Sequence, residues 1–284
     1  MKTVAPTQGA SGAAAVRGHY DELDRFYREV WGEHVHHGLW LTGRESPEEA
    51  VRQLSRRVAD HAGIGAGSRV CDVGSGYGAT ARLLARERGA RVTAITLSSA
   101  QHDYAVSVDP DAANPRYRLG DWLRNDLPEQ SFDAVIAIES SEHMADKAGF
   151  FAEARRVLRP GGRLAVCAWL ARRSATRLER RFLLEPISHE GRMPALETRE
   201  RYRAFFREAG FRLEADEDLT RRVARTWTIC LRRVAAGVLR PAHFRRYLLE
   251  NRGSERVFLL TMLRIRLAYR LGSMRYGLVA GVRE

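Results

Sequence analysis

The fold of this chain is decided by the stretch Val70-Cys71-Asp72-Val73-Gly74-Ser75-Gly76-Tyr77-Gly78-Ala79-Thr80. It begins as a short apolar strand and continues, after the glycines, into a helical pattern. Gly74 and Gly76 permit a tight turn and allow a ligand to approach the backbone closely. The start of the following helix presents free N–H groups, which favour an anionic group. The stretch therefore predicts a strand, a ligand-binding turn and a helix.

Short apolar runs alternate with helical patterns on both sides of this turn, from residue 68 to residue 170. This alternation is typical of βαβ units, which build a parallel sheet, so the predicted fold class is α/β. We expect five strands here and two toward the C-terminus, at residues 69–73, 91–95, 117–119, 132–138, 163–169, 211–219 and 274–282. Helices are expected at about 79–88, from about 99, and at 147–158.

The segments around this core have a different composition. The first residues are rich in Ala, Gly, Ser and Thr, and the segment after residue 170 is rich in Arg. Because the first core strand begins only at residue 69, we expect the core to fold without the residues up to about Gly38 but to turn over poorly. The predicted organisation is a disordered tail (1–18), a helical lid (19–67), the core (68–170), a cap segment (171–197), more core (198–220), a helical cap insertion (221–272) and a last core strand (273–284).

The net charge of +12 raises the question of a nucleic-acid partner. However, the basic residues are almost all arginines spread along helix faces, without interleaved aromatics in one short tract, which favours a solvated surface. We therefore expect no nucleic-acid partner, and an anionic substrate or membrane surface is the minority alternative. The apolar stretch 257–271 is interrupted by three arginines, which argues against an integral membrane segment. Three scattered cysteines fit a reduced, cytoplasmic protein, and no pattern indicates an oligomeric state.

Five stretches carry a family resemblance: residues 20–22 with 31–40, residues 72–78, residues 95–98 with Gln101, residues 139–147, and residues 156–162. They resemble class I S-adenosylmethionine (SAM)-dependent methyltransferases, and within them the γ-tocopherol methyltransferase group. The resemblance implies a Rossmann-like sheet of seven mostly parallel strands, with the last strand antiparallel, a helical N-terminal lid and a cap insertion. It implies SAM as the cofactor, bound at the carboxyl ends of the first strands.

The glycine-rich turn and the resemblance together predict the SAM site. Asp72, at the end of the first strand, is placed to accept a hydrogen bond from the ammonium group of SAM. No acid follows the second strand to hold a ribose, which disfavours a dinucleotide site. The residues expected to bind the cofactor are Tyr20, Trp40, Asp72, Gly74, Gly76, Thr96, Leu97, Gln101, Asp121, Trp122 and Glu139.

Several aromatic and histidine residues have a second interpretation. Trp122 either covers the adenine ring or anchors a surface, and Tyr20 and Trp40 either face the sulfonium cation or pack the lid on the core. The lid histidines His34, His36 and His37 are close enough in sequence to suggest a metal site. No second cluster of ligands completes such a site, so we expect no metal.

His143 and Glu139 follow the fourth strand closely and are the predicted catalytic residues. For a hydroxyl or phenol acceptor, His143 is the natural base, with a rate that rises through a pKa near ~6.5. The alternative is that His143 caps a helix and orients the substrate. Glu139 is preferred as the base if the acceptor is a carbon centre, where a carboxylate can stabilise a developing cation.

The function predicted from these features is methyl transfer to a hydrophobic small molecule, in specialised natural-product metabolism. The acceptors considered are a phenol or quinol, a prenylated compound and a polyketide-like product. The alternatives are methylation of a carbon centre in an isoprenoid chain and, from another class, a dinucleotide-dependent oxidoreductase. A nucleic-acid methyltransferase is a third alternative, but no Asn-Pro-Pro-aromatic tetrapeptide follows the fourth strand.

Overall fold

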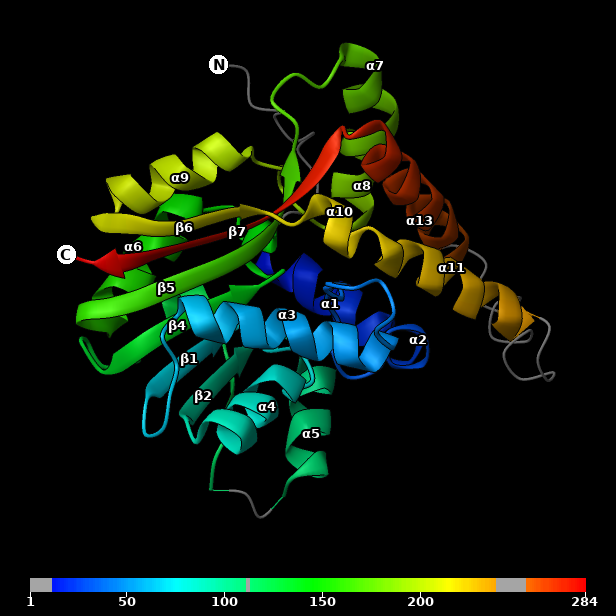
Figure 1. The fold of residues 1–284 in the computed structure, drawn as a ribbon. Helices are drawn as coiled ribbons and strands as arrows, with labels where there is room; N and C mark the ends of the chain where they lie inside the picture. Colours follow the sequence, from blue (N-terminus) through cyan, green and yellow to red (C-terminus); the bar gives the residue numbers. More distant parts are fainter. Residues whose placement is uncertain (1–11, 111–112, 239–253) are drawn as a thin grey trace.

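A computed structural model describes residues 12–110, 113–238 and 254–284. They form one twisted sheet with helices on both faces (Figure 1). The seven strands, in their order across the sheet, are β3 (Arg116–Leu119), β2 (Arg91–Thr96), β1 (Arg69–Val73), β4 (Phe132–Ile138), β5 (Leu158–Ala171), β7 (Met274–Arg283) and β6 (Phe211–Asp218).

The topology of the sheet confirms the predicted fold class. The pairs from β3 through β5 are parallel, whereas β7 runs antiparallel to both β5 and β6. The central strand β1 therefore ends at the same edge as β2 and β4. In an open α/β sheet, ligands bind at this carboxyl edge, where the strand order reverses.

The two faces of the sheet carry separate apolar cores. One face packs against α3 (Pro47–His61) and α4 (Ala79–Arg88), and the other packs against α6 (Lys147–Val157) and α9 (Arg199–Glu208). The remaining helical segments are α1 (Ala13–Glu22), α2 (Asp24–Val30), α5 (Ser99–Val108), η1 (Trp122–Arg124), η2 (Ser141–His143), α7 (Arg177–Glu179), η3 (Arg180–Leu184), α8 (Glu185–Glu190), α10 (Thr220–Val223), α11 (Arg225–Val238) and α13 (Ser254–Leu271).

Side-chain caps set the beginnings of several helices, as the sequence predicts for such residues. The Ser46 hydroxyl accepts from the Glu49 amide ahead of α3, and Pro47 occupies the first turn. Asp146 accepts from the Gly149 amide ahead of α6, and Thr198 accepts from the Arg201 amide ahead of α9. These caps position the helices on either side of the carboxyl edge.

Two expected boundaries differ from the structure. β5 begins at Leu158 rather than at residue 163, because the backbone at Phe132 already pairs with Leu158 before a register shift. The expected disordered tail overlaps α1, which begins at Ala13; three consecutive alanines favour a helix there. The first 11 residues of that tail and residues 239–253 of the expected cap insertion lie outside the described residues.

The N-terminal lid is part of the main core rather than an attachment to it. Leu23, Tyr27, Val30 and Leu39 are all buried in the same cluster as the side chains of α3 and α4. The loop after α2 is also hydrogen-bonded to the core, since the Leu39 amide donates to the Ala50 carbonyl at 2.8 Å. The structure therefore argues against the expectation that the core folds without this segment. No described helix is long and apolar enough to cross a membrane.

We predict that Leu39→Ala lowers the free energy of unfolding by about 2–5 kcal/mol, because it leaves a cavity in the main core. Leu41→Ala is the matched control, because Leu41 is 54% exposed whereas Leu39 is 1% exposed. The control is expected to change stability by less than ~0.5 kcal/mol. Urea unfolding followed by circular dichroism measures both, and equal effects of the two substitutions would show that the lid is not part of the core.

Candidate active site

The glycine-rich turn lies at the carboxyl end of β1. Gly74, Gly76 and Gly78 all have positive φ, at 73°, 54° and 75°, a conformation that suits glycine. A Cβ on Gly74 would lie 2.3 Å from Cβ of Ser140, so this glycine is needed for the approach of β1 to β4. A Cβ on Gly76 would meet nothing closer than 3.9 Å, although Gly76 lines a cleft. Its backbone is therefore open to a ligand.

The cleft beside this turn, called the cofactor cleft below, brings together residues from α1, the turn and the exits of β2, β3 and β4. Most residues that the sequence assigns to SAM line it: Tyr20, Gly74, Gly76, Thr96, Leu97, Gln101, Asp121, Trp122 and Glu139. His143 lines it as well. The strand order explains this convergence, because these exits are neighbours at one edge of the sheet.

Asp72 fits the role of holding a cationic group. Its side chain is buried, and Oδ2 has no hydrogen-bond partner among the described residues. Burial raises the pKa of Asp72 to about 7. A buried carboxyl oxygen without a donor is costly unless a ligand supplies one. Asp72 precedes the turn but is not among the residues that line the cofactor cleft. An ammonium group in the cleft would therefore reach this oxygen through a bridging water rather than directly, and with such a water the residues present fit SAM.

The exit of β2 is built without an acid. The Thr96 hydroxyl donates to Oε1 of Gln101 at 3.0 Å, and the Ser98 hydroxyl accepts from the Gln101 amide at 3.1 Å. The lid provides the nearby carboxylate, because Asp21 of α1 accepts from the Ser98 hydroxyl at 2.5 Å. Leu97 also contacts α1, because its carbonyl accepts a hydrogen bond from Nε of Arg17 at 3.1 Å. The lid therefore contacts this edge of the cofactor cleft through polar groups.

Asp121 and Trp122 lie where the sequence predicts, after β3. The Asp121 carboxylate accepts from the Leu123 amide at 2.9 Å. The Trp122 ring is 2% exposed, and its Nε1 donates to the Phe150 carbonyl at 3.3 Å. The interpretation of Trp122 as a surface anchor is therefore wrong, since the ring is a core residue with one side on the cleft.

Trp40 does not contribute to the cofactor cleft. Its backbone amide donates to the Arg222 carbonyl at 3.0 Å, and its Nε1 donates to the Glu45 carbonyl at 3.3 Å. These bonds direct the ring into a separate cavity that His34 and His36 also line. The assignment of Trp40 to SAM is therefore corrected. Sequence spacing could not reveal this, because the direction of a loop side chain depends on its backbone bonds.

The lid histidines have structural partners. His34 and His36 lie 3.2 Å apart, between Nδ1 and Nε2, close to the hydroxyls of Ser55 and Thr80. Burial lowers the pKa of His36, so a neutral ring is favoured. Within the described part of the chain, no group of three or more His, Cys, Asp or Glu side chains could hold a metal ion.

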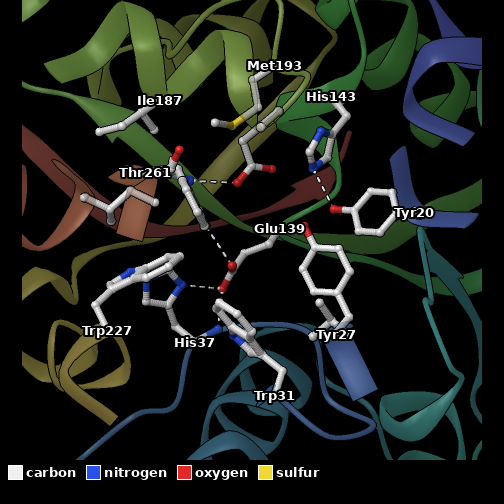
Figure 2. Close-up of a pocket in the computed structure, with 15 residues that line it drawn as sticks. Tyr20, Tyr27, Trp31, His37, Glu139, His143, Ile187, Met193, Trp227 and Thr261 are labelled. Carbon is white, nitrogen blue, oxygen red and sulfur yellow. Dashed lines mark hydrogen bonds and ion pairs between the residues drawn. The ribbon is translucent and has the colours of Figure 1, made fainter. Parts of the chain in front are cut away.

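A second cavity, called the aromatic pocket below, lies beside the cofactor cleft (Figure 2). Its walls come from the lid, from the exits of β4 and β5, and from the cap helices: Tyr20, Tyr27, Trp31, Val35, His37, Glu139, Glu142, His143, Trp169, Ile187, Gly191, Met193, Trp227, Thr261 and Ile265. Tyr20, Val35, Glu139 and His143 line both cavities. These four residues are therefore the wall across which two ligands would meet.

Glu139 lies at the centre of this wall in a left-handed conformation, with φ of 55°. Four donors bind its carboxylate. Oε1 accepts from the His37 amide at 2.7 Å, from His37 Nδ1 at 3.0 Å and from the Tyr276 hydroxyl at 2.8 Å, while Oε2 accepts from Trp169 Nε1 at 2.6 Å. Burial alone would raise the pKa of Glu139, but His37 outweighs it and lowers the pKa to about 2.

The hydrogen-bond partners of His37 indicate which of its ring nitrogens carries a proton. Nε2 accepts from the indole Nε1 of Trp227 at 2.8 Å, and an indole nitrogen can only donate. The proton of a neutral ring is therefore on Nδ1, which faces Glu139. The Tyr269 hydroxyl is also 3.2 Å from Nε2. His37 thus donates to Glu139 through Nδ1, a role that the sequence did not indicate, since we considered this histidine as a metal candidate.

Sequence reasoning missed the other members of this network because they are distant in sequence. Trp169, Trp227, Tyr269 and Tyr276 come from β5, α11, α13 and β7. Their aromatic rings fit ordinary core positions. No motif connects them, and only the packing of the cap on the sheet brings them to His37 and Glu139.

His143 lies on the same wall, at the end of η2. Its Nε2 is 3.0 Å from the Tyr20 hydroxyl, and the two rings meet edge to face. Burial lowers the pKa of His143 to about 4, although the nearby backbone of Arg192 favours the charged ring. The imidazole is therefore neutral at physiological pH, and the residue lines both cavities.

Comparisons with known proteins identify the family of this chain. Residues 8–238 match the model of the family described as mycolic acid cyclopropane synthetase. The chain is 35% identical over 214 residues to 27-O-demethylrifamycin SV methyltransferase of Amycolatopsis mediterranei (strain S699), which covers 74% of this chain and 78% of that relative. The chain belongs to the SAM-dependent methyltransferases of this family.

Two further similarities cover nearly all of this methyltransferase. It is 28% identical over 292 residues to 2-methyl-6-phytyl-1,4-hydroquinone methyltransferase of Synechocystis sp. (strain ATCC 27184 / PCC 6803 / Kazusa), covering 98% of this chain and 90% of that relative. The structure of the cyclopropane synthase MmaA2 from Mycobacterium tuberculosis has the same fold, with a TM-score of 0.83, 20% identity and coverage of 98% and 100%. Family membership makes SAM the cofactor and excludes the dinucleotide-dependent oxidoreductase.

We predict that Gly76→Val abolishes binding of S-adenosylhomocysteine, because the side chain would project into the cofactor cleft. Gly67→Val is the control for backbone strain, since Gly67 has a φ of 77° and equally open space but does not line the cleft. Calorimetry on both variants, after circular dichroism shows that they are folded, measures the effect. Wild-type affinity in Gly76→Val would rule out this turn as the cofactor site.

Proposed function

We propose that this methyltransferase transfers the methyl group of SAM to a hydroxyl of a hydrophobic small molecule bound in the aromatic pocket. The observation that carries the proposal is the common wall of Tyr20, Val35, Glu139 and His143. A cofactor on one side and an acceptor on the other meet there, and positioning of two reactants accounts for much of the barrier in such a displacement.

The chemistry of the aromatic pocket supports a hydrophobic acceptor. Trp31, Trp169 and Trp227 line it, and their rings pack edge to face in pairs. Apolar walls with few polar groups are typical of small-molecule sites. Named relatives methylate a demethylrifamycin and a phytyl hydroquinone, which supports a phenol, quinol or polyketide-like acceptor from specialised metabolism. A cytoplasmic location stays a prediction.

His143 is the better proton acceptor of the two predicted catalytic residues. Glu139 has three donors on Oε1 and one on Oε2, and its pKa is lowered, so its basicity is low. His143 is neutral, and its Nε2 lies 3.0 Å from the hydroxyl of Tyr20, with which it shares a hydrogen bond. An acceptor hydroxyl that reaches the wall can replace the Tyr20 hydroxyl on this nitrogen and give up its proton there.

Each of the polar residues on the shared wall then has one role in methyl transfer. When bound, SAM supplies an electrophilic methyl group on a cationic sulfur. The fixed negative charge of Glu139 favours a cation at the wall. Burial raises the pKa of Tyr20 well above its ordinary value, so its ring and hydroxyl stay neutral. His143 takes the proton of the acceptor as the oxygen–carbon bond forms.

One observation favours the alternative reaction, methylation of a carbon centre: the negative charge of Glu139 lies beside the aromatic pocket. A developing carbocation would be stabilised by this carboxylate. Because four donors bind it, we expect Glu139 to act as a stationary charge rather than as a base. Comparing Glu139→Gln with His143→Ala on one acceptor separates oxygen from carbon methylation.

We predict that His143→Ala lowers the methylation rate by ~10²–10⁴-fold, with SAM affinity nearly unchanged. Loss of the base at the wall is the reason, and His102→Ala is the control, since His102 pairs with Asp103 away from both cavities. Mass spectrometry of the methylated acceptor measures the rate. A wild-type rate in His143→Ala would leave His143 as an orienting residue.

The pH dependence differs from the sequence-based expectation of a rise near ~6.5. Since burial lowers the pKa of His143 to about 4, the base is already neutral above that pH. We predict that kcat/KM of the wild-type enzyme falls only as the pH approaches 4, and that His143→Ala loses this fall. An inflection between about 6 and 7 that disappears in His143→Ala would contradict the buried environment of the ring.

A further inference from the structure

Two acids stand three residues apart where β4 ends, and both line the aromatic pocket. Glu139 is used above as a fixed charge, whereas Glu142 has no role in that account. The Glu142 residue is 2% exposed. A buried carboxyl on a ligand pocket is a functional candidate when its surroundings differ from those of a neighbouring acid.

The hydrogen bonds of the two carboxyl groups differ sharply. Glu139 accepts from four donors, but Glu142 accepts from one close donor, the Trp169 amide, at 2.8 Å on Oε1. Oε2 is 3.4 Å from the Ser141 hydroxyl, which is itself 2.8 Å from the Tyr202 hydroxyl. Among the residues that the structure describes, the contact of Glu142 Oε2 is therefore this long one to Ser141.

No cation compensates for this lack of donors. Nζ of Lys147 donates to the backbone carbonyls of Glu142 and Met144 rather than to the carboxyl group. Among the described residues, no ion pair involves the Glu142 carboxyl. A buried ionised carboxylate is costly without donors or a paired cation, so the neutral acid is the favoured form.

Taken together, the surroundings of Glu142 raise the pKa of its carboxyl group. Burial is the largest cause and raises the pKa of Glu142 to about 8; the Trp169 amide and Lys147 lower it, and the negative Glu139 raises it. The phenol groups of Tyr20 and Tyr202 have pKa values raised by burial and are neutral. The segment from 139 to 143 thus holds an anion, a neutral acid and a neutral base.

We propose that the protonated Glu142 carboxyl donates a hydrogen bond to the acceptor, which therefore carries a carbonyl or similar oxygen in addition to the methylated hydroxyl. The geometry points to this because Glu142 lines the same pocket as His143, with one oxygen held by the Trp169 amide. The acceptor class is a hydroxy-ketone or hydroxyquinone. The inference rests on the proposed function, since it names the acceptor of that same site.

The experiment measures the binding of two ligands rather than the rate of methylation. Acetylnaphthalene carries a ketone, and ethylnaphthalene is its hydrocarbon analogue, so neither ionises nor accepts a methyl group. Quenching of tryptophan fluorescence in the full-length protein reports binding in a pocket lined by three tryptophans. The ratio of the two affinities is measured for the wild type, Glu142→Gln, which keeps a neutral donor, and Glu142→Leu, which has none.

The ketone preference is expected to fall about tenfold from the wild type to Glu142→Leu and to persist in Glu142→Gln. Raising the pH from about 7 to about 9 ionises Glu142 and should abolish the preference in the wild type, but not in Glu142→Gln. A purely structural role would weaken both ligands equally and leave the ratio unchanged.

An unchanged ratio in Glu142→Leu, or a wild-type protein without a ketone preference, overturns the proposal. Thermal unfolding and S-adenosylhomocysteine affinity of each variant confirm that the fold and the cofactor cleft are intact. Neither probe is methylated, so this failure would leave the assignment of His143 standing. Conversely, a ketone preference in an enzyme that methylates no hydroxyl would contradict the proposed function alone.

Discussion

The buried carboxylate of Glu139 is the interaction on which the rest of the site depends. It receives donors from the lid loop, β5 and β7, and through His37 it also connects α11 and α13. Removing one partner of a buried charged network leaves the other unsatisfied, which is strongly destabilising. The lid and the cap are therefore positioned by one charge at the exit of β4, and the aromatic pocket exists because they meet there.

The charge of Glu139 also bears on the protonation states of the neighbouring ionisable residues. Because Glu139 is held ionised by four donors, a second carboxylate beside it is unfavourable, and Glu142 is the neutral acid of the pair. His143, buried between the two cavities, is a neutral base. Three ionisable groups within five residues thus differ in protonation state because of burial and donor count, and on this basis we propose that they face a cation, an acceptor oxygen and a proton.

The parts of this account that depend on local pattern could be predicted from the sequence. The period of the apolar runs located the strands within a few residues, and the glycine turn indicated where the cofactor cleft lies. Parallel strands end at one edge, so Thr96, Asp121 and Glu139 had to be neighbours. The direction of lid side chains could not be predicted, as Trp40 shows. The donors to Glu139 could not be found either, because Trp169 and Tyr276 reach it only through tertiary packing.

The central claim is that methyl transfer takes place across the wall shared by the cofactor cleft and the aromatic pocket. The most direct measurement is a crystal structure with S-adenosylhomocysteine and a naphthyl methyl ether, the product of methylation of a naphthol. We expect the sulfur beside Tyr20 and Glu139, and the ether oxygen in the aromatic pocket next to Nε2 of His143. An ether bound in the cavity around Trp40, or a sulfur turned away from Glu139, would contradict it.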